Sequence, residues 1–438
     1  MILYVAMINR TCPRFADLKE FDYVPNLQIW SNLTTSLICR KDFEMKKIIA
    51  FFKKELMLTV AVLAAIIALI ITPPTLELVK NIDWHTLATL FMMLTVLEGF
   101  KQENIFLPFL KFAGRISTMR GLSFFLIFCV FFSSMFVTND VSLIIFVPLT
   151  IILFRAGGKE KYILPVISME NIAAIRGSLL TPFGSPQNLF LYGQSGVPAT
   201  TFMLHMSPLW ISSMALLSIF ICVLYRKNPK LPVIGEVADG PTSTVVSTGS
   251  SSSLKPWEKD RRYKRIVYLV LFAVVVATIV SRTALWPYIT LGLIIVVLVS
   301  DRKILTKTDY VLLLTFLCFF VFSSSIAANE AISGFLTKSV AGNEYWWSIL
   351  LSQLISNVPA SIVLWPFTTN LAALLYGLDS AGLCSLIGSL ASVINYRIYV
   401  REYPGNGGRF IKVFTLISLA FFAIVALPFW WLSSVWTF

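Results

Sequence analysis

The chain has 438 residues, of which 57% are hydrophobic and only 13% are charged, and its formal net charge is +13. Soluble domains are roughly 45–50% apolar and about 25% charged, so this composition excludes an ordinary soluble protein. The basic residues lie in loops between apolar segments, where membrane topology explains them better than nucleic-acid binding does, so we expect an integral membrane protein with no nucleic-acid partner.

Residues 1–54 differ from the rest, because they contain short apolar runs but no stretch of about 20 apolar residues. We interpret them as a cytosolic N-terminal extension. Inside it, at Met45, the sequence MKKIIAFFKK is typical of the basic beginning of a first membrane helix. Two interpretations stay open: residues 1–44 lie upstream of the functional start, or they form a cytosolic tail.

The remaining chain predicts an all-α polytopic membrane protein with about nine transmembrane helices and two re-entrant helical hairpins. The hairpins are 121–154 and 345–375, because each of these apolar regions carries a polar interruption near its centre. Some of the nine spans are shorter than about 20 residues, which tilting accommodates. The spans are 55–72, 84–100, 162–180, 201–225, 266–282, 284–300, 310–326, 379–397 and 410–433.

The first hairpin is interrupted at Thr138, Asn139 and Asp140. A carboxylate deep in a membrane costs at least ~2.5 kcal/mol, so Asp140 is expected to have a partner. We predict a coupling Na⁺ or proton near Asn139 and Asp140, with oxygen atoms from Thr138 contributing. An alternative, which is compatible with the first, is that Asp140 caps the half-helix that follows.

A second break is expected in the stretch TPFGSPQN at 181–188, because two prolines and a glycine disrupt a helix. It exposes main chain beside polar side chains, and we expect the break to border the substrate or cation site, although a plain structural kink is the alternative. The candidate residues are Gly184, Ser185, Gln187 and Asn188.

The second half repeats these features in weaker form. Ser356 and Asn357 interrupt the second hairpin without a carboxylate, so we expect the first hairpin to dominate charge-coupled binding. Gly388 and Ser389 correspond to the pair Gly184-Ser185, although they are also typical of small residues at a helix contact. The role of Arg176 stays open between pairing with Asp140, pairing with Glu170 and binding an anion.

These features divide the chain into two repeats. The first is 55–225, and a cytosolic linker at 226–265, rich in Pro, Gly, Ser and Thr, follows it. A connecting helix at 266–283 then precedes the second repeat at 284–433. The extra crossing inverts the second repeat, an arrangement that recurs among secondary transporters.

The basic residues predict the orientation. With the N-terminus cytosolic and the C-terminus outside, the inside segments contain 32 of the 36 Lys and Arg residues. The outside loops then contain only Lys80, Arg282 and Lys338, and Arg176 lies within the membrane. Counting either hairpin as two full spans would destroy this asymmetry. The inside segments are 1–56, 101–120, 155–161, 226–265, 301–309 and 397–412.

Four motifs resemble the anion-permease, citrate transporter-like branch of the ArsB/NhaD-type ion transporter superfamily. They are IDWHT at 82–86, TNDVSLIIFVPLTI at 138–151, GSLLTPFGSPQNLFLY at 177–192 and SNVPASIVL at 356–364. The likeness spans nearly the whole chain after residue 50. It implies a scaffold domain and a moving transport domain that holds both hairpins, with Asn139 and Asn357 beside the substrate and cation sites.

We therefore predict a secondary transporter, or permease, that moves a small anion by alternating access in symport with Na⁺ or H⁺, without a cofactor. Alternatives are a sodium/proton antiporter or an arsenite-type efflux permease, and outside this class an intramembrane enzyme or a passive channel. No pattern of a paired base and nucleophile indicates an enzyme, and no P-loop indicates an ATP-driven pump. We expect a bacterial plasma membrane location and a homodimer, by resemblance to such transporters.

Overall fold

The computed structural model describes residues 55–73, 78, 80–103, 105, 112–113, 116–233 and 262–437. The predicted extension at 1–54 and most of the predicted linker lie outside these residues. The chain divides into two units, Met1–Val60 and Ala61–Phe438, and the second contains nearly all that is described. Its elements are helices, and among the described residues one β-bridge joins Thr118 to Pro232. The prediction of an all-α polytopic protein is confirmed at this level.

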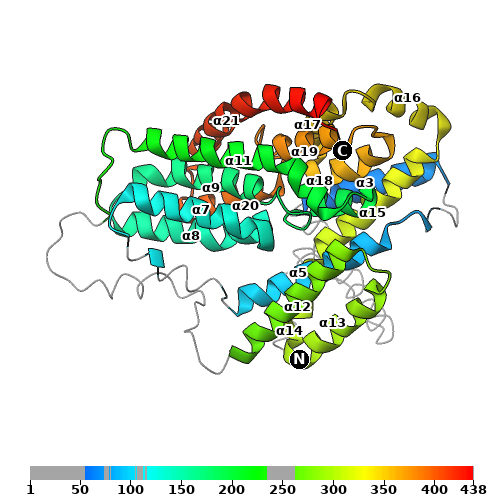
Figure 1. Ribbon diagram of the computed structural model, residues 1–438, viewed down its shortest axis with the longest axis horizontal. Helices are drawn as coiled ribbons and strands as arrows, with labels where there is room; N and C mark the ends of the chain where they lie inside the picture. Colours follow the sequence, from blue (N-terminus) through cyan, green and yellow to red (C-terminus); the bar gives the residue numbers. More distant parts are fainter. Residues whose placement is uncertain are drawn as a thin grey trace, which may run out of the picture. The chain divides into compact units, whose positions relative to one another are not determined.

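The helices of the first half follow the predicted segments closely (Figure 1). Two of them, α7 and α8, form the first hairpin. Residues 178–185, which overlap the predicted break at 181–188, separate α9 from α10. The bounds are α3 (Leu56–Ile71), α5 (Trp84–Gln102), α7 (Met119–Val137), α8 (Asn139–Ala156), η2 (Glu160–Tyr162), α9 (Ile163–Gly177), α10 (Pro186–Ser195) and α11 (Ala199–Leu224).

The second half begins with α12, which corresponds to the predicted connecting helix. Its short helices α14 and α16 were not predicted. The bounds are α12 (Arg262–Ser281), α13 (Trp286–Asp301), α14 (Lys303–Lys307), α15 (Tyr310–Ala327), α16 (Glu330–Val340), α17 (Glu344–Ile355), α18 (Asn357–Leu364), η4 (Trp365–Phe367), α19 (Leu371–Ala381), α20 (Leu390–Glu402) and α21 (Gly407–Val435).

Two boundaries in the second half correct the sequence analysis. The segment 379–397, predicted as one span, is wrong, because α19 ends at Ala381 and α20 begins only at Leu390. The predicted hairpin 345–375 is too long. Its second arm, α18, ends at Leu364, and the next helix, α19, already begins at Leu371. A long apolar run does not show where the chain turns inside it, so hydropathy merged α19 with its neighbours.

The same capping device starts α5 and α15. Asp83 precedes α5 with φ −78° and ψ 83°, and its side chain accepts a hydrogen bond from the Thr86 backbone N–H at 2.9 Å. Asp309 precedes α15 with φ −76° and ψ 82° and accepts from the Leu312 N–H at 3.0 Å. Each aspartate satisfies a backbone donor that the first helical turn leaves free.

Each hairpin packs tightly on the helix that follows it: α7 and α8 on α9, and α17 and α18 on α19. Glycine allows this approach, because a Cβ on Gly177 would lie 1.9 Å from the Phe131 carbonyl oxygen and one on Gly377 would lie 2.5 Å from the Tyr345 carbonyl oxygen. The halves also exchange helices: α10 packs on α18 and α19, whereas α20 packs on α8 and α9. In Figure 1, α20 accordingly lies beside α8 and α9.

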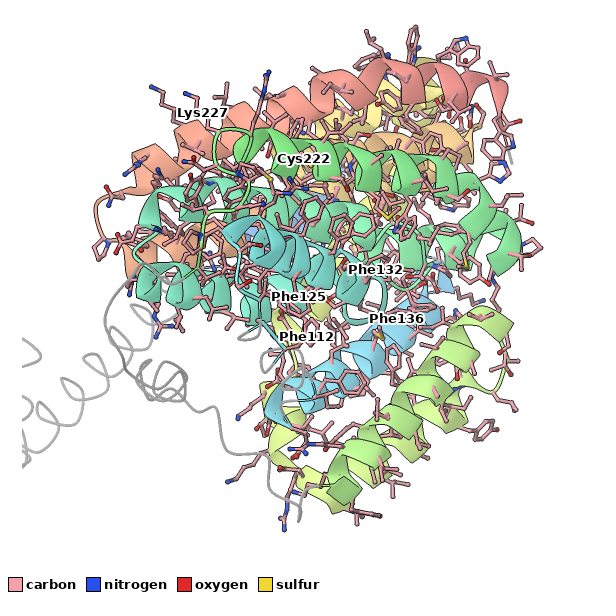
Figure 2. All side chains as sticks on the ribbon, turned by 60° about the vertical axis from the view of Figure 1, so that its left-hand side comes forward. Phe112, Phe125, Phe132, Phe136, Cys222 and Lys227 are labelled. Atoms are coloured by element: carbon pink, nitrogen blue, oxygen red, sulfur yellow. The ribbon has the colours of Figure 1, made fainter. Side chains whose placement is uncertain are left out.

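Large apolar side chains on the outer faces are typical of a surface that contacts lipid. Phe132 and Phe136 on α7 are 45% and 47% exposed, and Figure 2 shows them with Phe125 and the exposed Phe112. Among the described residues, six helices are long and apolar enough to cross a membrane. Both arms of the first hairpin are among them, so their length does not separate a re-entrant hairpin from two full spans, and that assignment still rests on the charge distribution.

Candidate functional site

The first hairpin turns at Thr138, between the end of α7 and the start of α8. Thr138 has φ 68° and ψ 155°, in a region of backbone conformation that is essentially reserved for glycine. The next residue, Asn139, is only 5% exposed, and its Oδ1 accepts a hydrogen bond from the Asp140 N–H at 3.0 Å. A conformation this costly persists only where the surrounding structure enforces it, and such positions cluster at functional sites.

The second hairpin turns at Ser356 with nearly the same backbone, φ 71° and ψ 158°. Asn357 follows at 2% exposure, and its backbone N–H donates to the Gly388 carbonyl oxygen at 3.2 Å. The two tips therefore share both the strained hydroxyl-bearing residue and the buried asparagine that follows it. Their side chains were predicted as site residues, and the structure places each set at the first turn of a half-helix.

The tips differ in the polar atoms they leave free. Asp140 Oδ1 at the first tip is buried and has no hydrogen-bond partner among the described residues, and neither has Asn357 Nδ2 at the second. The first tip thus presents a carboxylate acceptor, whereas the second presents an amide donor. The N-cap residue of α8 is Thr138, whose side chain makes no capping hydrogen bond, and Asp140 lies in the first helical turn.

The breaks between paired helices lie against the hairpin tips of their own half. Thr181 Oγ1 donates to the Met135 carbonyl oxygen near the end of α7 at 2.5 Å. In the second half, Gln353 Nε2 near the end of α17 donates to the Ala381 carbonyl oxygen at 3.1 Å. A hydrogen bond therefore joins hairpin and break in both halves.

The glycine and serine of each break also correspond. A Cβ on Gly184 would lie 2.1 Å from the Ser178 carbonyl oxygen, and one on Gly388 would lie 2.3 Å from that of Ala381. Ser185 and Ser389 precede α10 and α20 in extended conformations, with φ −144° and φ −147°. Both serines are 1% exposed. The break in the second half, which only weak sequence signals predicted, thus has the same geometry as the first.

Gln187 and Asn188, predicted beside the first break, both contact Asp379 of α19. Gln187 Nε2 donates to Asp379 Oδ1 at 3.1 Å, and Asn188 Nδ2 donates to Asp379 Oδ2 at 3.4 Å. Asp379 is 1% exposed. The sequence analysis missed this residue, although a carboxylate inside the apolar run LAALLYGLDSAGL was a readable signal.

Arg176 lies near Asp379 and is fully buried, with its guanidinium 5.7 Å above the Phe421 ring centroid. The opposite charges of Arg176 and Asp379 act on each other, and none of the three guanidinium nitrogens has a hydrogen-bond partner in the described part of the chain. Glu170 instead accepts a hydrogen bond from Thr150 of α8. The structure therefore does not support pairing of Arg176 with Glu170. It adds Asp379 as a carboxylate near Arg176.

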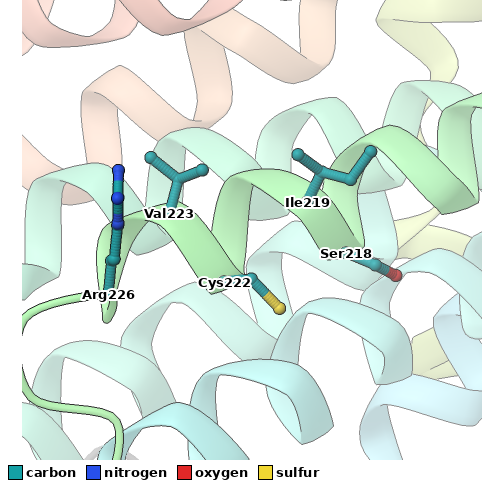
Figure 3. A pocket seen from close by; sticks show the side chains of 5 residues that line it. All are labelled: Ser218, Ile219, Cys222, Val223 and Arg226. Carbon is teal, nitrogen blue, oxygen red and sulfur yellow. The ribbon is translucent and has the colours of Figure 1, made fainter.

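A shallow groove on α11 lies apart from these residues. Its lining comes from α11 and the turn that follows it, and it contains none of the predicted site residues (Figure 3). Cys222 and Val223 are exposed there, as expected of a lipid-facing surface. The lining residues are Ser218, Ile219, Cys222, Val223 and Arg226.

Comparisons with known proteins agree with this architecture. Residues 48–388 match the citrate transporter family, CitMHS. The inner membrane protein YbiR of Escherichia coli (strain K12) is 30% identical over 72% of this chain and 80% of its own length. The uncharacterized transporter MJ0456 of Methanocaldococcus jannaschii is 29% identical over 78% of this chain and 88% of its own length.

Among solved structures, the YdaH transporter of Alcanivorax borkumensis covers 82% of this chain and 87% of its own at 16% identity, with a TM-score of 0.46. A likeness this weak supports no inference about fold or function. The family match spans most of the chain, including both tips and both breaks, and the two curated relatives cover most of their own lengths. The chain therefore belongs to the citrate transporter family and is an integral membrane transporter.

Proposed function

We propose that this transporter is a secondary permease that moves a small anion by alternating access, in symport with Na⁺ or H⁺. The observation that carries the proposal is the pair of hairpin tips, which have the same backbone but leave opposite polar atoms free. Thr138 and Ser356 differ by only 3° in both φ and ψ. One framework thus holds an acceptor for a cation and a donor for an anion.

Two inverted repeats account for the paired geometry. In this scheme α5, α7, α8, α9, α10 and α11 correspond to α15, α17, α18, α19, α20 and α21. Support comes from the matching Asp caps, hairpin tips, breaks and helix exchange described above. The connecting helix α12 would supply the extra crossing that inverts the second repeat relative to the first.

The acceptors of the first half suit a coupling cation. Asp140 Oδ1, Ser185 Oγ, Gln187 Oε1 and Asn188 Oδ1 are buried oxygens without a hydrogen-bond partner among the described residues. Leaving a buried polar atom unpaired costs about 1–3 kcal/mol, so these oxygens favour binding of an ion or a proton donor. Oxygen ligands are what hard cations prefer.

The donors of the second half suit an anion. Asn357 Nδ2 is an unpaired amide donor at the start of α18, where the helix dipole adds partial positive charge. The same dipole acts at the start of α8. A small anion between the two half-helix termini would be stabilised from both sides, and a cation bound at Asp140 would balance its charge. This linkage is the physical basis for coupling in our proposal.

Movement would separate the helices into two groups. One group, around α5, contains α12, α13, α14 and α15, which pack on it. The other contains both hairpins and the broken helices. We propose that the first group is the scaffold and that the second moves against it, with a homodimer fixing the scaffold in a bacterial inner membrane and the N-terminus in the cytosol.

The test is uptake into proteoliposomes, recorded as currents on a solid-supported membrane. Citrate, succinate, arsenite, phosphate and sulfate are supplied one at a time under an imposed Na⁺ or H⁺ gradient. We expect a saturable, gradient-dependent signal with at least one of these anions. Na⁺-driven proton movement without any anion signal would instead establish a sodium/proton antiporter, and equal flux without a gradient would establish a channel.

A further inference from the structure

Asp379 connects the two halves of the molecule at their broken helices. It lies in α19, whereas the two amides that it accepts from, Gln187 and Asn188, lie in the first turn of α10. On the other side of this arrangement, Asn171 of α9 donates to Ser392 of α20 at 3.0 Å, and Asn395 of α20 donates to the Ile167 carbonyl oxygen at 2.7 Å. Of these buried contacts, only those of Asp379 involve a charged side chain.

A carboxylate in this position dictates how the amides are turned. An ionised carboxylate accepts hydrogen bonds and donates none, so both side-chain NH₂ groups must face Asp379. The carbonyl oxygens of both amides then point to other surroundings. These atoms, Gln187 Oε1 and Asn188 Oδ1, are buried without a partner among the described residues, as is the neighbouring Ser185 Oγ. A neutral residue at position 379 would not impose this orientation.

Arg176 is a buried residue of opposite charge that acts on Asp379 without a direct hydrogen bond between them. Both side chains are buried, at 0% and 1% exposure, and desolvation of a lone carboxylate would cost several kcal/mol. The guanidinium belongs to α9, so the charge pair also relates α9 to α19. Removal of one partner leaves the other uncompensated, whereas removal of both does not.

We propose that Asp379 is a positioning residue that turns the amide oxygens of Gln187 and Asn188 toward the first break. The inference rests on the proposed function for its effect on transport, because the break is where we place the coupling-cation site. Its structural part, the contact between Asp379 and the amides, does not depend on transport and is tested separately.

The structural test is a double-mutant cycle on the full chain, read as thermal unfolding in detergent. The variants are Asp379→Asn, Gln187→Met and both together. We expect the double variant to lose clearly less stability than the sum of the single losses, because the two side chains interact. Gln194→Met is the matched control, since Gln194 lies on the same helix but donates to Asp83 at 2.6 Å, and its effect should add to that of Asp379→Asn. Additive shifts with Gln187→Met would overturn the proposal.

The functional test uses the double variant Arg176→Met with Asp379→Asn. It should recover most of the stability lost by either single variant, because both buried charges are gone. The double variant should fold, because neither buried charge is left without its partner. The carboxylate no longer holds the amides, so the cation concentration for half-maximal uptake should rise at least tenfold. A folded double variant with the wild-type cation dependence would contradict the positioning role.

A swap keeps the test decisive if Asp379→Asn alone does not fold. The combination Gln187→Glu with Asp379→Asn keeps one carboxylate and one amide at the contact and should be recovered as folded protein. Failure of both double variants to fold would contradict the proposal, because neither removal of both charges nor exchange of the carboxylate and the amide would then restore the contact. If the wild-type chain shows no transport, the proposed function fails, whereas the unfolding cycle still decides the role of Asp379.

Discussion

The two hairpin tips have the same backbone, yet they present different chemistry. Thr138 and Ser356 adopt the same strained conformation, and an asparagine that is almost fully buried follows each. The first tip continues with Asp140 and the second with Val358, so only the first adds a carboxylate. Backbone geometry is thus common to both halves, and one side chain makes them different. The fold therefore provides two hairpin tips with equivalent backbones, and we expect their side chains to determine what each tip binds.

The largest effect should follow from removal of the carboxylate at the first tip. Asp140→Asn should reduce gradient-driven uptake about 100-fold, because interactions of a charged group are worth roughly 1.5–3 kcal/mol and every 1.4 kcal/mol is about a factor of ten. The measurement is initial uptake into proteoliposomes as a function of cation concentration. Val358→Ala at the second tip is the control and should leave the cation dependence unchanged. Wild-type coupling in Asp140→Asn would remove the distinction between the tips.

A large loss of stability should follow from crowding the helix behind either hairpin. Gly177→Ala should destabilise by about 1–3 kcal/mol or more, since overpacking displaces closely packed backbone. Gly377→Ala should cost less, because its Cβ would lie 2.5 Å rather than 1.9 Å from the facing carbonyl oxygen. Thermal unfolding in detergent measures both. Gly292→Ala is the control, because nothing lies within 4 Å of its added Cβ, and it should be neutral or stabilising. Equal effects at all three positions would refute the close approach.

Relief of backbone strain should have a moderate effect of the same size at both tips. Thr138→Gly and Ser356→Gly should each be more stable than the corresponding alanine variant by about 1–3 kcal/mol, because glycine adopts this conformation without a steric cost. Unfolding temperatures of the four variants provide the measurement. Stabilisation by glycine at one tip only would show that the two tips differ in strain energy despite their similar backbone angles.

The smallest effect should come from an ion pair that also joins the halves but lies at the surface. Arg155 of α8 and Glu402 of α20 are 3.4 Å apart, with side chains 42% and 40% exposed. Glu402→Gln should change stability by about 0–1 kcal/mol, since solvent screens such pairs. Unfolding at low and high salt measures this change. A loss of stability as large as that of Asp379→Asn would mean that the buried contact does not stabilise the protein more than the exposed ion pair does.

Much of the helical architecture could be predicted because hydropathy and helix breakers are local signals. The polar tip at 138–140 and the prolines at 182 and 186 identified the first hairpin and the first break in the correct places. The second break was obscured, because the sequence AGLCSLIGSL between α19 and α20 contains no proline and stays largely apolar. Hydropathy therefore joined α19 to its neighbours, although tertiary packing separates them.

By itself the sequence determined that this protein lies in a membrane, where its first hairpin turns and which residues at the first break are polar. The tertiary structure decided what those residues contact. Gln187 and Asp379 are 192 positions apart, and no local pattern relates them. They meet because α10 packs on α19, and burial then favours a hydrogen bond between the carboxylate and the amide. Partner choice at this distance is a property of packing, so it became visible only once the helices were placed together.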